Sequence, residues 1–111
     1  MFSEIKILQE KISVIAEQLY QNDLVIANKG LAEVFPEINR IYLTFINDSE
    51  KYSEKGIDIP QDILISQMKN LIEAYESKDI LMLADTLKYE IYNGLSFCDD
   101  VLNSVENKII G

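Results

Sequence analysis

Apolar residues recur every three or four positions along most of this chain, which is the spacing of an α-helix with one buried face. The longest such stripe runs from Ile80 to Ile109, which corresponds to a helix of about 45 Å. Its members are Ile80, Leu83, Ala84, Leu87, Ile91, Leu95, Cys98, Leu102, Val105 and Ile109. A single helix cannot cover its own stripe, so the pattern predicts that other helices pack against it.

The first of three earlier helices is predicted from about Ser3 to Tyr20, and Ser3 is suited to its N-cap. Ile7 and Val14 lie off the main seam of this helix. They form either the edge of a wider buried surface or an exposed contact site. The main seam, with the spacing of a bundle helix, consists of Ile5, Leu8, Ile12, Ile15 and Leu19.

The second predicted helix starts at a cap of Asn22 or Asp23, and Pro36 interrupts it. The apolar residues on both sides of Pro36 share one face, so we expect a kink near Pro36 rather than the end of the helix. The polar segment that follows either continues the helix to Gly56, which would stop it, or frays into a loop. The stripe of this helix consists of Leu24, Ala27, Leu31, Val34 or Phe35, Ile38, Tyr42 and Phe45.

A third helix is predicted from Pro60 to about Glu76, and Asp79 then caps the last helix after a tight turn. Its seam consists of Leu64, Met68, Leu71 and Tyr75. Connections this short make consecutive helices antiparallel neighbours. The sequence therefore predicts an all-α fold in a single domain, residues 1–111. We expect an antiparallel up-down four-helix bundle with long second and fourth helices.

The residue types present restrict the possible chemistry. The chain has no His and a single Cys, Cys98. This excludes Cys/His zinc sites, Ser–His–Asp and Cys–His relays, and Glu-x-x-His di-iron sites within one chain. We expect Cys98 to be a buried apolar residue, and we expect no enzyme activity, no cofactor and no metal. The carboxylates of the last helix point in different directions around it, and they are Asp79, Asp85, Glu90, Asp99 and Asp100.

Glu90 differs from the other carboxylates because it flanks the apolar stripe. We expect it to be partly buried and paired, with Arg40 and Lys69 as candidate partners.

The chain is strongly acidic, with a formal net charge of −9. Such a surface repels phosphate backbones and anionic membranes, so we expect no nucleic-acid and no membrane partner. It fits a basic protein partner, or solubility alone. The sequence has no signal peptide and no run of about 18 apolar residues, which favours a cytoplasmic protein.

A candidate binding surface lies on the last helix, away from its buried stripe. Tyr residues are enriched in binding hot spots, so this surface is either a partner site or a set of rings that neighbouring helices bury. We call it the tyrosine ridge, and its members are Leu81, Asp85, Lys88, Tyr89 and Tyr92.

The stretch Leu83–Ile91, which follows the pair Lys78 and Asp79, resembles a recurring pattern in small uncharacterised bacterial four-helix proteins. The segment Ala27–Leu31 also resembles the second helix of those proteins. Proteins of that group are associated with flagellar motility and are similar in shape to flagellin export chaperones. The resemblance implies that Asp85, Tyr89 and Glu90 are characteristic polar positions.

The leading hypothesis is a non-enzymatic helical bundle that binds a protein segment, as a chaperone or adaptor for a secretion or motility component. One alternative is a structural homodimer whose partner is itself. The other is a carboxylate-based metal protein or enzyme.

Overall fold

The computed structural model describes the backbone of residues 2–110 and the side chains of residues 4–105. The described chain is helical, and it contains no strand. The last helix is continuous, and it contains one π-helical turn, η1. The elements are α1 (Phe2–Tyr20), α2 (Leu24–Asn47), α3 (Ser49–Glu54), α4 (Gln61–Glu76), α5 (Ile80–Asp85), η1 (Thr86–Ile91) and α6 (Tyr92–Ile110).

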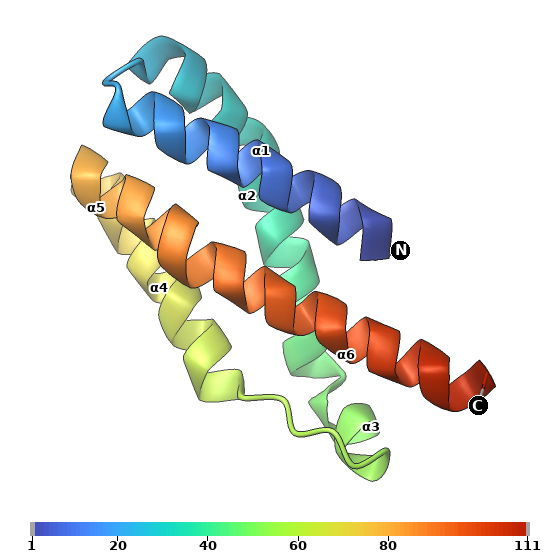
Figure 1. The fold of residues 1–111 in the computed structure, drawn as a ribbon. Helices are drawn as coiled ribbons and strands as arrows, with labels where there is room; N and C mark the ends of the chain where they lie inside the picture. Colours follow the sequence, from blue (N-terminus) through green and yellow to red (C-terminus); the bar gives the residue numbers. More distant parts are fainter. Residues whose placement is uncertain (1, 111) are drawn as a thin grey trace.

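The helices pack side by side into an elongated molecule of 47 × 25 × 19 Å. Helix α1 contacts α2, α5, η1 and α6, whereas α4 contacts α2, α5 and η1. The last helix therefore lies between α1 and α4, as Figure 1 shows. The predicted all-helical class is confirmed. The predicted number of four helices is wrong, because the polar segment after α2 forms a short helix of its own.

This short helix, α3, replaces both interpretations of the polar segment. Helix α2 ends at Asn47, and α3 begins two residues later. The rings of Phe45 and Tyr52 stack with centroids 5.3 Å apart, which holds α3 against α2. Gly56 follows the end of α3 with φ +79°, a left-handed conformation that glycine adopts without steric cost. Gly56 thus ends α3 rather than α2.

Helix α2 runs without interruption through Pro36, from Leu24 to Asn47. The continuity agrees with the apolar stripe that crosses this proline, and the kink near Pro36 stays a prediction.

Two tight turns join the long helices, and both use the same backbone arrangement. Asn22 and Lys78 adopt left-handed φ angles of 61° and 59°. In each turn, the next amide donates to a carbonyl five residues earlier, which closes the end of the preceding helix. The carboxylate of Asp79 accepts a hydrogen bond from the amide of Met82 at 3.1 Å, so its predicted capping role is confirmed.

The core follows the predicted seams in most places. All five predicted seam residues of α1 are buried. On α4 the prediction for Tyr75 is wrong, because its side chain is 51 % exposed and rests edge-on against Phe35. On the last helix Ile80 and Leu102 are half-buried, whereas Ile109 lies outside the described side chains. The largest fully buried side chains are Tyr42, Leu8, Ile12, Leu31, Ile38, Leu64, Leu71, Leu87, Ile91, Leu95, Val34 and Cys98.

A buried polar junction joins α2, α4 and α6. The Tyr42 hydroxyl donates a hydrogen bond to Oε1 of Gln67 at 2.6 Å. Both groups lie directly against Gly94, where an added Cβ would stand 1.9 Å from the Tyr42 hydroxyl. Glycine at this position therefore lets α6 approach the other two helices.

Candidate functional site

The tyrosine ridge lies on α5, η1 and the first turn of α6. Its central residues, Lys88 and Tyr89, belong to the π-helical turn η1. Single π-turns inside α-helices are rare and frequently occur at functional sites. The π-turn widens the helix at Tyr89. Leu81 precedes this turn in the chain, and Tyr92 follows it directly.

The centre of the ridge is held by contacts with Tyr20 at the end of α1. The Tyr20 hydroxyl donates a hydrogen bond to Oδ1 of Asp85. The Lys88 ammonium lies 5.5 Å from the centroid of the Tyr20 ring and 5.2 Å from that of Tyr89. At these distances a cation is attracted to both ring faces. Three predicted ridge residues are thus joined to one residue that the prediction did not include.

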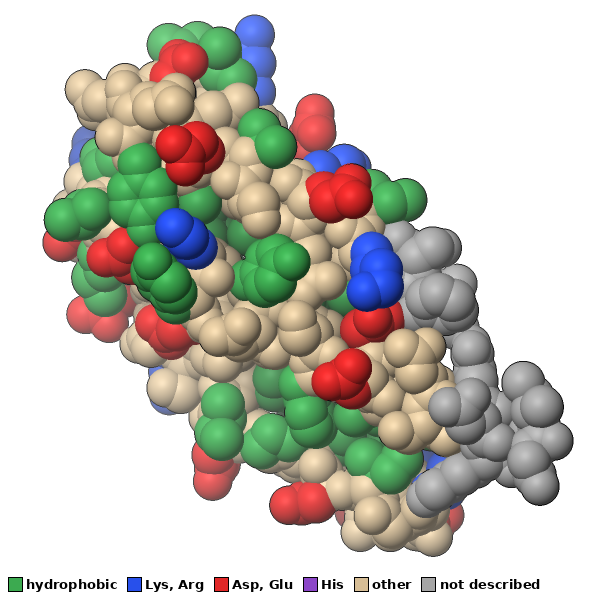
Figure 2. Space-filling view, in the orientation of Figure 1, with side chains coloured by type: hydrophobic (Ala, Val, Ile, Leu, Met, Phe, Trp, Pro, Cys, Tyr) green, Lys and Arg blue, Asp and Glu red, His purple; other side chains and the backbone are tan. Residues whose placement is uncertain are grey.

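The apolar side chains of the ridge are open to solvent. Leu81 is 63 % exposed, Tyr89 56 % and Tyr92 37 %. The described neighbouring helices therefore do not bury these rings, which was the alternative interpretation of the pattern. In Figure 2, apolar side chains gather over the side of the molecule where α5 lies, and a basic side chain lies among them.

The hydrogen bond with Asp85 changes the acidity of Tyr20. This bond, together with burial and nearby negative charge, raises the pKa of the Tyr20 phenol to about 12. The phenol, which is protonated at neutral pH in any case, therefore remains a donor to Asp85 until the pH approaches 12.

Helix α1 also fixes the backbone beside Tyr92. The buried Gln9 amide nitrogen donates hydrogen bonds to the carbonyl of Tyr92 at 3.0 Å and to Oγ of Ser96 at 2.8 Å. Tyr20 at the end of α1 and Gln9 near its middle therefore hold the ridge helix at two points. A ridge that is ordered before binding loses less conformational entropy when a partner docks.

The structure gives Glu90 a different partner from those expected. Glu90 is half-buried, and its Oε1 accepts a hydrogen bond from Nδ2 of Asn70 on α4 at 2.8 Å. Arg40 instead pairs with Glu4 on α1. The predicted partial burial of Glu90 is confirmed, and its predicted pairing with Arg40 or Lys69 is wrong.

Two grooves lie on other parts of the surface. The α1/α2 groove has a volume of about 480 Å³, and Ile7, Val14 and Ile26 are among its lining residues. The α2/α4 groove has a volume of about 640 Å³, and its lining includes Phe35 and Tyr75. Neither groove contains a member of the tyrosine ridge.

The remaining reactive groups are dispersed. Among the described side chains, no three Asp, Glu or Cys residues are grouped so that they could hold a metal ion. Cys98 is buried as expected, and burial raises the pKa of its thiol to about 12. A neutral thiol without access to solvent, such as that of Cys98, is a poor nucleophile. Asp99 is also buried, and it pairs with Lys6 at 3.5 Å.

No helix in the described part of the chain has the length and apolar character needed to cross a bilayer.

Comparison with curated proteins and with solved structures found no match. Residues 3–96 match a protein family that is described as a domain of unknown function, DUF8042. Because this match extends over most of its length, the chain belongs to the DUF8042 family.

Proposed function

We propose that this protein is a non-enzymatic binding module that holds a segment of a protein partner on its tyrosine ridge. The observation that carries the proposal is the solvent-exposed Tyr89 ring, which Lys88 and the Tyr20–Asp85 hydrogen bond keep in place. Exposed aromatic anchors on an ordered support are typical of binding hot spots.

The proposed partner presents an amphipathic helix with basic flanks. Its apolar face would cover the rings of Tyr89 and Tyr92 and the side chain of Leu81. Its basic residues would be attracted by a chain whose net charge is −9.

The proposed setting is a cytoplasmic chaperone or adaptor for a secretion or motility component. Its support is the resemblance of the stretch Leu83–Ile91 to motility-associated bacterial proteins. In this proposal the four long helices act as an antiparallel bundle, bent near Pro36, and the ridge helix is one wall of that bundle.

Affinity capture from a lysate of the native host tests the proposal. The wild type is compared with the double variant Tyr89→Lys/Tyr92→Lys, and captured proteins are identified by mass spectrometry. The matched control is Ile63→Lys/Ile65→Lys, which places two lysines on exposed apolar positions of α4. Circular dichroism verifies that all three proteins are folded.

The expected result is a partner captured by the wild type and the control and lost with the ridge variant. Binding of the purified partner should weaken as salt concentration rises, because exposed charges attract the basic flanks. Equal capture by the ridge variant, or the absence of any partner, would contradict the proposal.

A further inference from the structure

The α1/α2 groove is an apolar surface that the described part of the chain leaves uncovered. Ile7 and Val14 line it from α1 and Ile26 from α2. Their side chains are 54 %, 56 % and 51 % exposed. Ile7 and Val14 are two helical turns apart, so they lie along the same side of α1. Contact with another apolar surface would remove these side chains from water.

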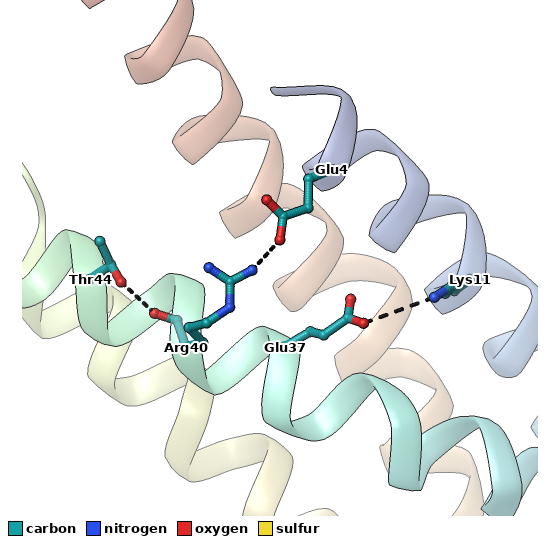
Figure 3. Close-up of polar contacts among 5 residues, drawn as sticks. All are labelled: Glu4, Lys11, Glu37, Arg40 and Thr44. Carbon is teal, nitrogen blue, oxygen red and sulfur yellow. Dashed lines mark hydrogen bonds and ion pairs between the residues drawn. The ribbon is translucent and has the colours of Figure 1, made fainter. Parts of the chain in front are cut away.

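Charged side chains surround the apolar lining, and some of them are already paired. Lys11 pairs with Glu37 at 3.9 Å across the two helices, and Arg40 pairs with Glu4 in the same way (Figure 3). Glu10, Lys29 and Glu33 also line the groove. None of these three has an ion-pair partner among the described residues, so their charges are available to another molecule. All three side chains are exposed.

The free charges are separated along the groove. Gly30 lies against Ile15, since a Cβ on Gly30 would be 2.7 Å from Cγ1 of Ile15. Lys29 is therefore near the level of Ile15, whereas Glu10 is five residues earlier on α1, about 8 Å away. Glu33 is one turn further along α2, toward the end where Lys11 and Glu37 meet. The free acids thus lie toward one end of the groove and the free lysine toward the other.

We propose that a second copy of this chain covers the α1/α2 groove. A two-fold axis that lies in the interface plane and crosses the groove at right angles reverses the direction of the groove, so the acidic end of one copy faces the basic end of the other. This arrangement brings Glu10 of each copy to the same end of the interface as Lys29 of the other copy, where the two side chains pair across the groove. The apolar residues of the two grooves then cover one another.

Charge favours a second copy over a basic partner at this groove. Two chains of net charge −9 repel each other over most of their surfaces. The lining of this groove contains two acidic and two basic side chains, so its formal charge is zero. Repulsion between copies is consequently weaker here than the net charge of the chain would suggest. The groove does not include the tyrosine ridge, so this inference stands independently of the proposed function.

Charge exchange tests the arrangement, with association measured by sedimentation equilibrium from low-micromolar to near-millimolar concentration. The wild type should form a dimer. Glu10→Lys and Lys29→Glu should each raise the dissociation constant by more than about tenfold, because each places like charges opposite one another twice. An equimolar mixture of the two variants should form a heterodimer, because both pairs of opposite charges return.

Two further variants serve as controls. Glu54→Lys, on α3, changes net charge by the same amount as Glu10→Lys and should leave the dimer unchanged. Tyr89→Lys/Tyr92→Lys should also dimerise, which separates this inference from the proposed function. The inference is overturned if the wild type is monomeric, if the single variants dimerise as the wild type does, or if their mixture fails to associate. Loss of the dimer in either control would overturn it as well.

Discussion

Two tyrosine hydroxyls join pairs of helices in this protein, and their surroundings differ. Tyr42 is fully buried, and its hydrogen bond to Gln67 lies directly beside Gly94. Tyr20 donates to Asp85 at the surface, where water also solvates the carboxylate. The same type of bond therefore has different consequences. The buried bond determines how closely three helices pack, whereas the exposed one orders a surface without contributing much to folding.

The largest expected effect is at the buried junction. Gly94→Ala places a Cβ 1.9 Å from the Tyr42 hydroxyl and 2.4 Å from Oε1 of Gln67, so either these side chains or α6 must shift. We expect the free energy of unfolding to fall by about 3 kcal/mol, measured by urea denaturation. Ser104→Ala, at an exposed position on the same helix, is the control. A loss no larger than that of the control would show that the junction is loosely packed.

Tyr42→Phe removes the hydroxyl and keeps the ring. Oε1 of Gln67 then loses its donor in a half-buried place, and we expect a loss of about 1–2 kcal/mol in the free energy of unfolding. Gly94→Ala should cost less in this background than in the wild type, because the closest contact has been removed. Strict additivity in a double-mutant cycle would contradict the direct contact between these residues.

Tyr20→Phe has the smallest expected effect, about 0.5 kcal/mol at neutral pH, because the bond is partly solvated. Its pH dependence is more informative. The pKa of Tyr20 is raised from 10.0 to about 12 in the folded state. Its contribution to stability is therefore complete below pH 10 and is lost as pH rises through 12.

We therefore expect the wild type to lose more unfolding free energy than Tyr20→Phe as the pH rises above 10. Phenolate absorbance provides a second measurement. The variant should lack the titration step near pH 12 that belongs to the Tyr20 phenol. Identical alkaline stability curves for the two proteins would show that the bond to Asp85 is absent in solution.

The same contrast separates what the sequence could predict from what it could not. The seam of α1 and the Asp79 cap depend on spacing and on local hydrogen bonds, so they could be predicted. Tyr20 could not be assigned to the ridge, because its partner Asp85 is 65 residues away. Gln9 and the Tyr92 carbonyl are 83 residues apart. Contacts of this kind depend on how the helices are placed relative to one another. The spacing of apolar residues along the chain does not predict them.

One missed element did leave a trace in the sequence. Leu83, Leu87, Ile91 and Leu95 follow one another at intervals of four. In a regular α-helix each such step drifts by about 40° around the axis, so the stripe would leave the core. A wider turn corrects this drift, and η1 lies within that run. An ideal helical wheel hides the signal because it assumes a constant number of residues per turn.

The wide turn also makes the chain tolerant of a change in length. Deleting one residue within Thr86–Ile91 would let regular helical turns replace the wide one, and these turn the chain through a similar angle with one residue fewer. Leu95 and Cys98 would then still face the core, whereas Lys88 and Tyr89 within the turn would change their positions around the helix. In this segment the number of residues therefore determines where the tyrosine ridge lies, and relatives that align here without gaps should share the wide turn.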